Sequence, residues 1–576
     1  MLRASFGAEQ RIDQMSNSAG AVIAAQRMRA ERRMIEALRA AEAFSPDKAI
    51  PLAPDRNLAR LALRGLLRQN AIRQAQAGFY YLDEPVYAVV RKNRQRMLIG
   101  VVVIAVVFGV AIAIATSSRA QTSAPAAPAP RPDQVAFRAL YEELVETNTT
   151  LSEGSCTLAA ERMGARLTAA GFPAADVRVL APADRQKDGN LVATLHGSDA
   201  AAPALLLLAH IDVVEANRAD WTRDPFTLIE EGGYFYARGA SDDKAQAAVW
   251  VDTLVRLKQD GFTPARDIKL ALTCGEETSD VHNGVEWLLA EHPETLQAGF
   301  ALNEGAGGLL DDEGDRLALS VQAGEKIYQD YTLELTNPGG HSSRPRKDNA
   351  IVAMANGLAR VGAWDFPLEL NPVTRAYFAA LAETQPQHAA DMRALSAAAG
   401  PDAAAAARVS AANPSWNATL RTTCIPTLID GGHAPNAQPQ KVTANINCRI
   451  LPGHTVAEAQ AELTRLMDNA AISITPVGVP SPTAPPPELS DAIMGPIREV
   501  AGEMWPNVPI LPTMTTGATD GRFTNAAGIP TYGVTGMFGD PDGGGVHGLN
   551  ERIRVRSLYE GRDFLFEIVK RYAMQD

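Results

Sequence analysis

Residues 204–212 read ALLLLAHID, and residues 268–277 read IKLALTCGEE. Each stretch contains an apolar run, which is typical of a strand buried on both faces of a parallel sheet. Between them, residues 245–258 read AQAAVWVDTLVRLK and predict a helix. This order of strand, helix and strand predicts an α/β fold from about Asp133 onward, with a mainly parallel central sheet flanked by helices.

Polar side chains follow both predicted strands directly. His210 and Asp212 end the first stretch, and Glu276 and Glu277 end the second. Because functional residues of open α/β sheets gather beyond the carboxyl ends of the strands, we expect these four side chains to lie close together. An imidazole binds metal only when it is neutral and oriented, and Asp212 could orient His210 by accepting its other ring proton.

Five residues form a candidate set of metal ligands: His210, Asp242, Glu277, Glu304 and His547. Two imidazoles and three carboxylates suffice to hold two zinc-class cations around a water. Asp242, in the stretch ARGASDDK, could bridge both cations through its two oxygens. Of the pair Glu276-Glu277, one carboxylate would bind metal while the other holds a proton near the attacking water. The set predicts metal-assisted hydrolysis.

The stretches that carry these residues resemble the motifs of one family, and they occur in that family's order: LLLLAHIDVV, WTRDPF, YARGASDDK, LTCGEE, ALNEGAG, NPGGHSSRP, TDGRF and VHGLNE. The family is the M20 metallopeptidases, with carboxypeptidase G2-like, aminoacylase-1-like and carboxypeptidase S-like members. The resemblance covers the chain from about Asp133 to the C-terminus.

The resemblance implies a role for each candidate residue. One metal is held by His210 and Glu304, the other by Glu277 and His547, and Asp242 bridges both. Glu276 is then the general base, and Asp212 is the residue that orients the first histidine. The family also has a cis peptide after the bridging aspartate, which here is the bond between Asp242 and Asp243.

A smaller domain is predicted to interrupt the catalytic domain. Residues 324–479 resemble the family's α+β lid, and the catalytic domain comprises residues 133–323 and 480–576. The Ala-rich interval 375–412 is long for such a lid and predicts extra helices. In relatives the lid often dimerises, so the resemblance implies a homodimer.

Three lid residues resemble functional residues of the family. His341, in GGHSS, resembles the histidine that stabilises the developing oxyanion, often from the neighbouring subunit. Asn436 and Arg449 resemble the residues that grip the substrate carboxylate, for which a guanidinium fork is well suited.

The apolar run 97–115, MLIGVVVIAVVFGVAIAIA, contains no charged residue and is long enough to span the roughly 30 Å core of a bilayer. It predicts a transmembrane helix, joined to the catalytic domain by the Pro/Ala linker 116–132. A cleaved signal sequence, which would give a secreted protein, is the alternative.

Charge predicts the orientation of this segment. Residues 1–96 contain 17 Lys and Arg against 9 Asp and Glu, and four of the basic residues lie within 91–96. We therefore predict a basic, helical, cytoplasmic N-terminal segment and an extracytoplasmic catalytic domain, either periplasmic or extracellular.

The chain has four cysteines. Cys424 and Cys448 fall on what look like neighbouring lid strands in an oxidising compartment, so a disulfide between them is predicted. Cys156 and Cys274 are expected to be small core residues.

The acidic balance of the chain, with a net charge of −12, argues against a nucleic-acid partner. Neither a Gly-rich phosphate loop nor a serine nucleophile elbow is present. We predict a dinuclear hydrolase with two Zn²⁺, although Co²⁺ or Mn²⁺ could use the same ligands. Its substrate would be a peptide with a free C-terminal carboxylate, as for a carboxypeptidase or dipeptidase, or alternatively an N-acyl amino acid, as for an aminoacylase. An alternative of another class is a non-catalytic, membrane-tethered binding protein.

Overall fold

The structure is a computed structural model that describes residues 131–575, apart from 279–280, 398–399 and 401, and parts of the chain between 34 and 87. The chain divides into two compact units, residues 1–128 and 129–576, and each is described by itself. The predicted membrane segment 97–115 and most of the linker lie outside the described residues. In the part that the structure describes, no helix is both long and apolar enough to cross a membrane.

The first unit contains a small antiparallel sheet in the order β1-β3-β2. Its elements are a 3-10 helix (Pro46–Lys48), β1 (Ile50–Pro51), β2 (Ile72–Gln76) and β3 (Phe79–Leu82). Gly78 lies in the turn between β2 and β3 with a φ of +83°, a conformation that favours glycine. The prediction that the first 96 residues form a helical segment is therefore wrong around Tyr80–Leu82, because these residues pair with β2.

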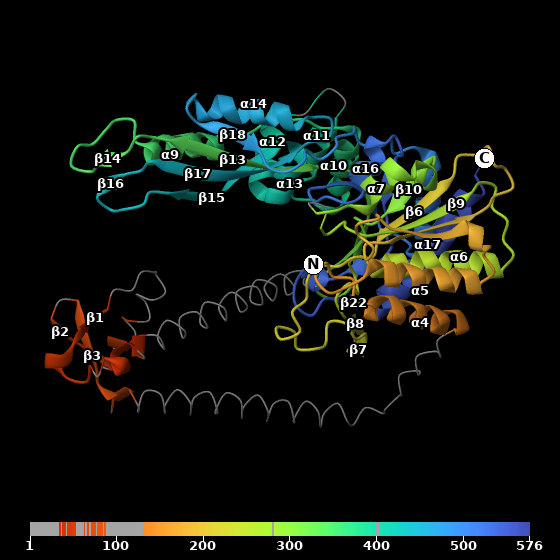
Figure 1. The fold of residues 1–576 in the computed structure, drawn as a ribbon, viewed down its shortest axis with the longest axis horizontal. Helices are drawn as coiled ribbons and strands as arrows, with labels where there is room; N and C mark the ends of the chain where they lie inside the picture. The colour runs from red at the N-terminus through yellow and green to blue at the C-terminus, as the bar shows by residue number, and fades with distance from the viewer. Residues whose placement is uncertain are drawn as a thin grey trace, which may run out of the picture. The chain divides into compact units, whose positions relative to one another are not determined.

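A ten-stranded sheet forms the core of the second unit (Figure 1). Its strands are β4 (Val177–Leu180), β5 (Asn190–Leu195), β6 (Leu205–His210), β9 (Ile268–Thr273), β10 (Phe300–Asn303), β11 (Gly308–Leu310), β12 (Arg316–Glu325), β19 (Ile510–Thr515), β20 (Thr531–Gly533) and β21 (Phe538–Gly539). The order is β21-β11-β12-β20-β10-β6-β9-β5-β4, and β19 also pairs with β12.

The sheet is mixed rather than mainly parallel. The four central strands β20, β10, β6 and β9 are parallel to one another. The strands on either side of them, β12 and β5, run antiparallel to their central neighbours. The predicted parallel arrangement is correct for the centre, where strand–helix–strand connections occur, and wrong for the two strands that flank it, β12 and β5.

Helices cover both faces of the sheet, which explains why its central strands are continuous apolar runs. Leu205 and Leu207 of β6 face one core, whereas Leu206 and Leu208 face the other. The first core includes α4 (Pro132–Glu146), α5 (Cys156–Ala169), α6 (Lys244–Gln259), α15 (Asp491–Met504) and α17 (Val555–Ala573). The second includes α7 (Gly284–Glu291), α8 (Pro293–Leu296) and α16 (Gly521–Ala526).

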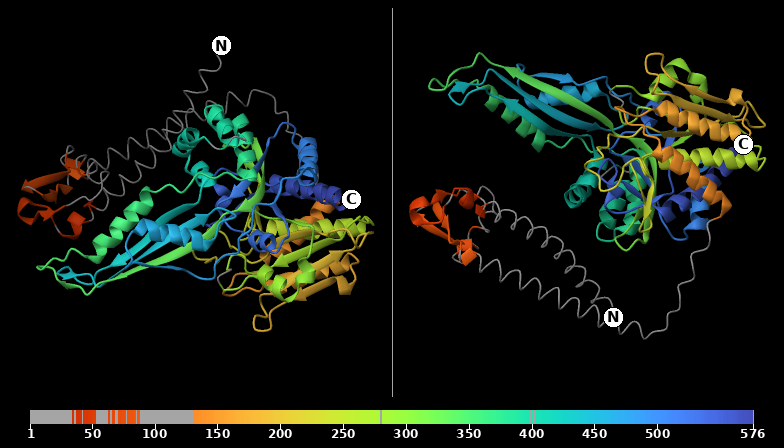
Figure 2. Two further views of the ribbon diagram at one scale, coloured as in Figure 1. Left: turned by 90° about the horizontal axis from the view of Figure 1, so that it is seen from above. Right: turned by 60° about the horizontal axis from the view of Figure 1, so that its bottom comes forward.

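The lid is an antiparallel sheet in the order β15-β17-β13-β18, with helices on one face (Figure 2). Its elements are β13 (Ile327–Thr336), α9 (Ala350–Ala363), β15 (Thr423–Gly431), β17 (Lys441–Ile450), α14 (Val456–Met467) and β18 (Ser473–Pro476). Alternate residues of β13 and β17 are buried against the helices, as expected for a sheet with one open face. Because β12 ends at Glu325 and β13 begins at Ile327, the lid starts close to the predicted position.

Two short strands, β14 (Gly340–His341) and β16 (Ala437–Gln438), pair at the end of the lid that is remote from the central sheet (Figure 1). The Ala-rich interval forms helices, as predicted. These are α10 (Pro372–Thr384), α11 (Ala389–Ser396), α12 (Ala403–Ala412) and α13 (Pro414–Leu420). Their core includes Ala318 of β12 and Leu511 of β19, so they pack against the edge of the central sheet.

A further small sheet, in the order β22-β8-β7, lies beside the candidate site. Its strands are β7 (Ile229–Glu231), β8 (Tyr234–Tyr236) and β22 (Arg552–Arg554), and the remaining 3-10 helices are Ala174–Asp176 and Gly543–Gly545. Pairing of β22 with β8 brings the segment after His547 next to the segment before Asp242. Residues that are 300 positions apart thereby meet at one site.

Candidate active site

The candidate ligands lie at the edge of the central sheet where the parallel strands end. His210 is the last residue of β6, Glu304 follows β10 directly, and Glu277 lies four residues beyond β9. The other two come from loops, since Asp242 precedes α6 and His547 precedes β22. Adjacent parallel strands end at the same edge, which is why residues so distant in sequence converge.

Asp242 lies between the two histidines. Its Oδ1 is 3.2 Å from Nε2 of His210, and its Oδ2 is 3.1 Å from Nε2 of His547. Glu277 Oε1 is 2.9 Å from the same nitrogen of His547, and Glu304 Oε1 is 3.8 Å from Nε2 of His210. The carboxylate of Asp242 thus presents one oxygen to each half of the cluster, as a bridging ligand would.

Glu276 belongs to the same cluster. Ligand atoms of His210, Glu276 and Glu304 all lie within 4.8 Å of one another, and so do those of His210, Asp242 and Glu277. The structure therefore brings together all five candidate ligands and the carboxylate predicted to act as the base.

The charge of the cluster fits bound cations. Burial, reinforced by neighbouring carboxylates, raises the pKa of both Glu276 and Glu304 well above the usual value. Hydrogen bonds to Asp242 and Glu277 raise the pKa of His547 to about 10. Among the described residues, no Lys or Arg side chain forms an ion pair with Asp242, Glu276, Glu277 or Glu304. Divalent cations held by these imidazoles and carboxylates would supply the missing positive charge.

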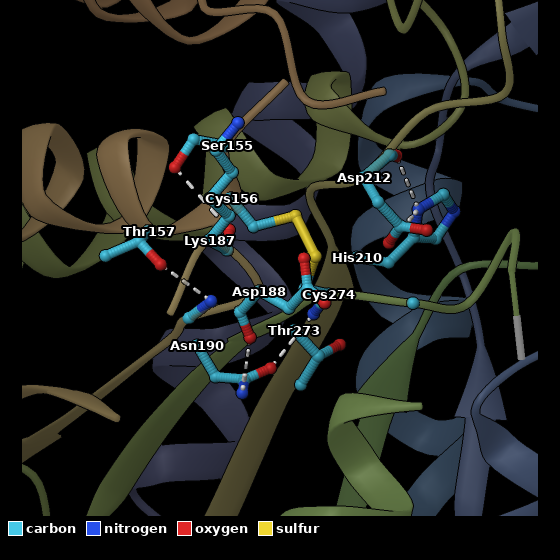
Figure 3. Close-up of a disulfide and its surroundings, with 12 residues drawn as sticks. Ser155, Cys156, Thr157, Lys187, Asp188, Asn190, His210, Asp212, Thr273 and Cys274 are labelled. Atoms are coloured by element: carbon cyan, nitrogen blue, oxygen red, sulfur yellow. Dashed lines mark hydrogen bonds and ion pairs between the residues drawn. A yellow bond between two sulfur atoms is a disulfide. The ribbon is translucent and has the colours of Figure 1, made fainter. Parts of the chain in front are cut away.

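Asp212 orients the glutamate pair as well as His210. Nδ1 of His210 lies 3.1 Å from the backbone oxygen of Asp212 and 3.6 Å from its carboxylate (Figure 3). The carboxylate instead accepts the backbone N–H groups of Glu276, at 3.3 Å, and Glu277, at 3.0 Å. His210 is therefore closer to the backbone oxygen of Asp212 than to its carboxylate, which was the expected partner. The carboxylate of Asp212 instead holds the segment that carries both glutamates.

Glu551 positions the loop that carries Asp242. Its buried carboxylate accepts the backbone N–H groups of Gly239, Ser241 and Asp242 and pairs with Arg238 at 2.7 Å. Sequence reasoning missed this residue, although it lies four positions after His547 in the quoted stretch VHGLNE. The expected cis peptide between Asp242 and Asp243 is present.

Glu551→Ala should lower the free energy of unfolding by about 3–5 kcal/mol, because it leaves the buried Arg238 unpaired and three N–H groups without an acceptor. Urea-induced unfolding measures this loss. The control Glu462→Ala removes the exposed ion pair to Arg465 and should stay close to wild type. Equal stability of the two variants would contradict the role of Glu551.

A second buried carboxylate supports the strand ends. Asp520 accepts a hydrogen bond from Nδ2 of Asn283 at 2.6 Å and another from Oγ1 of Thr273 at 3.0 Å. It therefore ties the end of β9 to the start of α7. Asp520 lies in the stretch TDGRF, one of the family-like motifs, but the motif alone does not indicate that its partners are Asn283 and Thr273.

The three predicted lid residues do not reach the cluster together. His341 lies on β14, at the remote end of the lid, where Nδ1 contacts Oγ of Ser343 at 2.7 Å. Asn436 is next to it, and its backbone oxygen accepts the N–H of Ser342. Arg449, in contrast, lies near the C-terminal end of β17, at the other end of the lid. There its Nη1 donates a hydrogen bond to the backbone oxygen of Thr516 at 2.8 Å. Because Asn436 and Arg449 lie at opposite ends of the lid, they do not meet at one carboxylate-binding site within a single chain.

Both cysteine pairs form disulfides. Cys424 and Cys448 are opposite each other on β15 and β17, so the predicted bond is confirmed. Cys156 and Cys274 are buried core residues, as expected, but they are also bonded to each other, which was not predicted from the sequence (Figure 3). Cys156 opens α5 and Cys274 follows β9, and packing of α5 against the sheet brings them together across a sequence separation of 118 residues.

A cleft of about 450 Å³ opens beside the cluster. Asp242 and Glu304 line it on one side, and the glycine-rich stretch 305–308 follows. Apolar side chains add to the lining, among them Met537, Phe538, Val546 and Ile553. The cleft can hold an apolar group next to the candidate metal ligands.

The combination of this fold with this cluster places the protein among the metal-dependent hydrolases. Over residues 206–571 the sequence matches the profile of peptidase family M20/M25/M40, and the chain belongs to that family. The resemblance seen in the motifs is thereby confirmed, and the protein is an enzyme of the metallopeptidase and amidohydrolase class.

Relatives in this family have several different activities in their names. Human N-fatty-acyl-amino acid synthase/hydrolase PM20D1 is 28% identical over 388 residues, which are 66% of this chain and 76% of the human protein. Probable carboxypeptidase S-like 2 of Dictyostelium discoideum is 27% identical over 395 residues, 66% of this chain and 74% of the relative. Mouse aminoacylase-1 is 26% identical over 378 residues, 65% and 80% of the two chains.

Solved structures show the same fold. The M20 family metallo-carboxypeptidase Sso-CP2 from Sulfolobus solfataricus superposes with a TM-score of 0.55 at 18% identity, covering 77% of this chain and 100% of that one. A tripeptidase from Staphylococcus aureus superposes with a TM-score of 0.53 at 19% identity, covering 77% and 99%.

Proposed function

We propose that the protein is a two-zinc hydrolase that cleaves a peptide or N-acyl amide bond next to a free carboxylate. The observation that carries the proposal is the carboxylate of Asp242 between His210 and His547, with Glu276 in the same cluster. A non-catalytic binding protein has no need of an additional carboxylate beside such a ligand set. Two imidazoles with carboxylates suit zinc, and cobalt or manganese could use the same atoms.

Each candidate ligand has a proposed role. His210 and Glu304 would hold one ion, Glu277 and His547 the other, and Asp242 both. When bound, the ions polarise the scissile carbonyl and make a water acidic enough to attack near neutral pH.

Glu276 performs the proton transfers in this proposal. Its carboxylate takes a proton from the attacking water and returns it to the nitrogen of the leaving amine. A raised pKa suits a group that must both accept and donate a proton, and burial raises the pKa of Glu276. Asp212 positions the backbone of Glu276 by accepting a hydrogen bond from its N–H.

The substrate class follows from the cleft and the relatives. Carboxypeptidase or dipeptidase activity agrees with the carboxypeptidase S-like relative. The apolar side chains of the cleft, which lie among charged ones such as Asp540 and Arg552, and the names of the PM20D1 and aminoacylase-1 relatives support the second candidate, hydrolysis of N-acyl amino acids.

A substrate panel tests the proposal and separates the two candidates. It contains dipeptides, short-chain and long-chain N-acyl amino acids, and the C-terminal amide of each. We expect release of free amine from at least one class and loss of turnover with the amides, because these lack the carboxylate. Absence of turnover throughout, with zinc supplied, would refute the proposal.

Arg449 is proposed to bind the substrate carboxylate. It lies on the open face of the lid near the central sheet, with its guanidinium 4.5 Å from the centre of the Tyr328 ring. His341 and Asn436 are exposed at the remote end, so in this proposal they act on the site of a neighbouring subunit.

The lid offers a surface for that neighbour. Strand β15 is the edge of the lid sheet and exposes Ile425, Leu428 and Ile429, with 60%, 69% and 58% of their surfaces accessible. An exposed apolar edge strand is prone to pair with another chain. We therefore propose a homodimer formed through the lid.

Leu428→Glu should convert the dimer to a monomer, because the new charge would be buried at the edge where two lids pair. Sedimentation equilibrium measures the mass of each species. Leu309→Glu, which alters an exposed leucine of the central sheet, is the matched control and should leave the mass unchanged. A monomeric wild type would contradict the dimer, as would a dimeric Leu428 variant.

The cellular location also belongs to the proposal. An anchor at residues 97–115 would hold the catalytic domain outside the cytoplasm, and two disulfides agree with an oxidising compartment. Secretion after cleavage of the same segment is the alternative.

A further inference from the structure

The Cys156–Cys274 disulfide is the covalent link nearest to the candidate catalytic residues. It joins the first residue of α5 to the residue that follows β9, two positions before Glu276 (Figure 3). Both cysteines are buried, with 2% and 5% of their surfaces accessible. One small cavity is lined by both cysteines and by Asp212.

On the Cys274 side of the disulfide, hydrogen bonds and close packing fix the conformation of the backbone. The N–H of Cys274 donates to Oδ1 of Asn190 at 2.9 Å, and its carbonyl accepts the N–H of Gly284 at 2.7 Å. Gly275 follows with a φ of +100°, and a Cβ there would lie 2.3 Å from the backbone oxygen of His282. The chain then reaches Glu276, whose N–H donates to Asp212.

On the other side, residues 147–156 touch the site at two further points. The fully buried Lys244 donates from Nζ to the backbone oxygen of Thr147 at 2.7 Å. The N–H of Val213 donates to the backbone oxygen of Thr149 at 3.4 Å. The segment before Cys156 therefore contacts the residues that follow Asp212 and the Asp242-Asp243 pair.

We propose that the Cys156–Cys274 disulfide is a positioning element of the active site. It ties the segment 147–156, which contacts the Asp212 and Asp242 loops, to the segment that carries Glu276 and Glu277. When the bond is open, only hydrogen bonds and the packing of α5 against the sheet hold this junction, and the glutamates lose their fixed distance from the other ligands. The inference rests on the proposed function, because that function gives the glutamates their roles.

The second disulfide provides a matched control. Cys424 and Cys448 link two lid strands that already pair along the whole of β15, and their sequence separation is 24 residues. That bond touches none of the candidate ligands. Opening it should leave the geometry of the cluster unchanged.

The test compares Cys156→Ala/Cys274→Ala with Cys424→Ala/Cys448→Ala in the full chain. Measured are kcat and KM on the best substrate of the panel and, independently of turnover, the affinity for Zn²⁺ in competition with a chelator. We expect the first variant to lose about 10- to 100-fold in kcat and to bind Zn²⁺ more weakly, with KM changed about twofold at most, as for other residues that support metal ligands. The lid variant should match wild type in kcat and in Zn²⁺ affinity.

A reduction experiment covers the case in which the first variant does not fold. In Cys424→Ala/Cys448→Ala only the site disulfide remains. A phosphine reductant gives it two electrons, two protons come from water, and the products are two thiols and the phosphine oxide. Activity and Zn²⁺ affinity should fall in step with the appearance of two thiols per chain and should return on reoxidation.

Two results would overturn the inference: unchanged kcat and Zn²⁺ affinity after two thiols have formed, or equal losses in both disulfide variants. If the wild type hydrolyses nothing in the panel, the proposed function fails instead, and the comparison of Zn²⁺ affinities still tests the positioning role.

Discussion

Replacing Glu276 with Gln is expected to lower kcat by about 10²- to 10⁴-fold while the protein keeps its full metal content. The amide has nearly the same shape as the carboxylate but cannot accept a proton from the attacking water. Because Glu276 is proposed as the base and the five other residues as ligands, the metals should stay bound. Steady-state kinetics and elemental analysis of the same sample measure the two quantities.

The matched control is Glu291→Gln, at the exposed end of α7, the helix that follows the glutamate pair. It should retain wild-type kcat. Wild-type activity of Glu276→Gln would remove this residue from the mechanism, and loss of metal together with activity would make it a ligand instead of the base.

Replacing Asp242 with Ala is expected to reduce activity by about a thousandfold, equivalent to about 4 kcal/mol of transition-state stabilisation, and to lower the metal content. Its two oxygens face His210 and His547, so its loss removes one ligand from each proposed ion. Removal of this carboxylate also leaves His210 and His547 without the acceptor that contacts both imidazoles.

Asp260→Ala is the corresponding control, since Asp260 is exposed at the end of α6, the helix that begins just after Asp242. It should keep two metals and normal turnover. An Asp242 variant that still binds two ions with wild-type affinity would contradict the bridging role.

The sequence predicts the cluster well because its members follow recognisable strands. His210 and Glu276 come directly after apolar runs, and parallel strands necessarily end at the same edge of the sheet. The motifs place Asp242 and His547 in family order, and the loops that carry them converge as expected. The clustering of the candidate ligands could therefore be predicted before any geometry was known.

Other features depend on contacts that no local pattern encodes. Cys156 and Cys274 are 118 residues apart, and their pairing requires the register of α5 on the sheet. Strands β5 and β12 flank the four central strands and run antiparallel to them, and the residue pattern of each strand does not show the direction in which it runs.

Glu551 and the lid residues illustrate the same limit. In the sequence, nothing distinguishes Glu551 from other acidic residues. In the folded chain, the pairing of β22 with β8 buries it against the Asp242 loop. The motifs indicate an oxyanion-stabilising role for His341 and a shared carboxylate-binding role for Asn436 and Arg449. Asn436 lies beside His341 at the remote end of the lid, whereas Arg449 lies near the other end of β17, which extends about 3.3 Å per residue between the two positions.

The proposed two-metal hydrolytic site can be tested most directly by titrating Zn²⁺ into the metal-stripped protein while amine release from the best substrate is followed. We expect activity to return as the second ion per chain binds and to be lost again when a chelator is added. Turnover that is independent of added metal, or a protein that binds no Zn²⁺ at this cluster, would contradict the proposal.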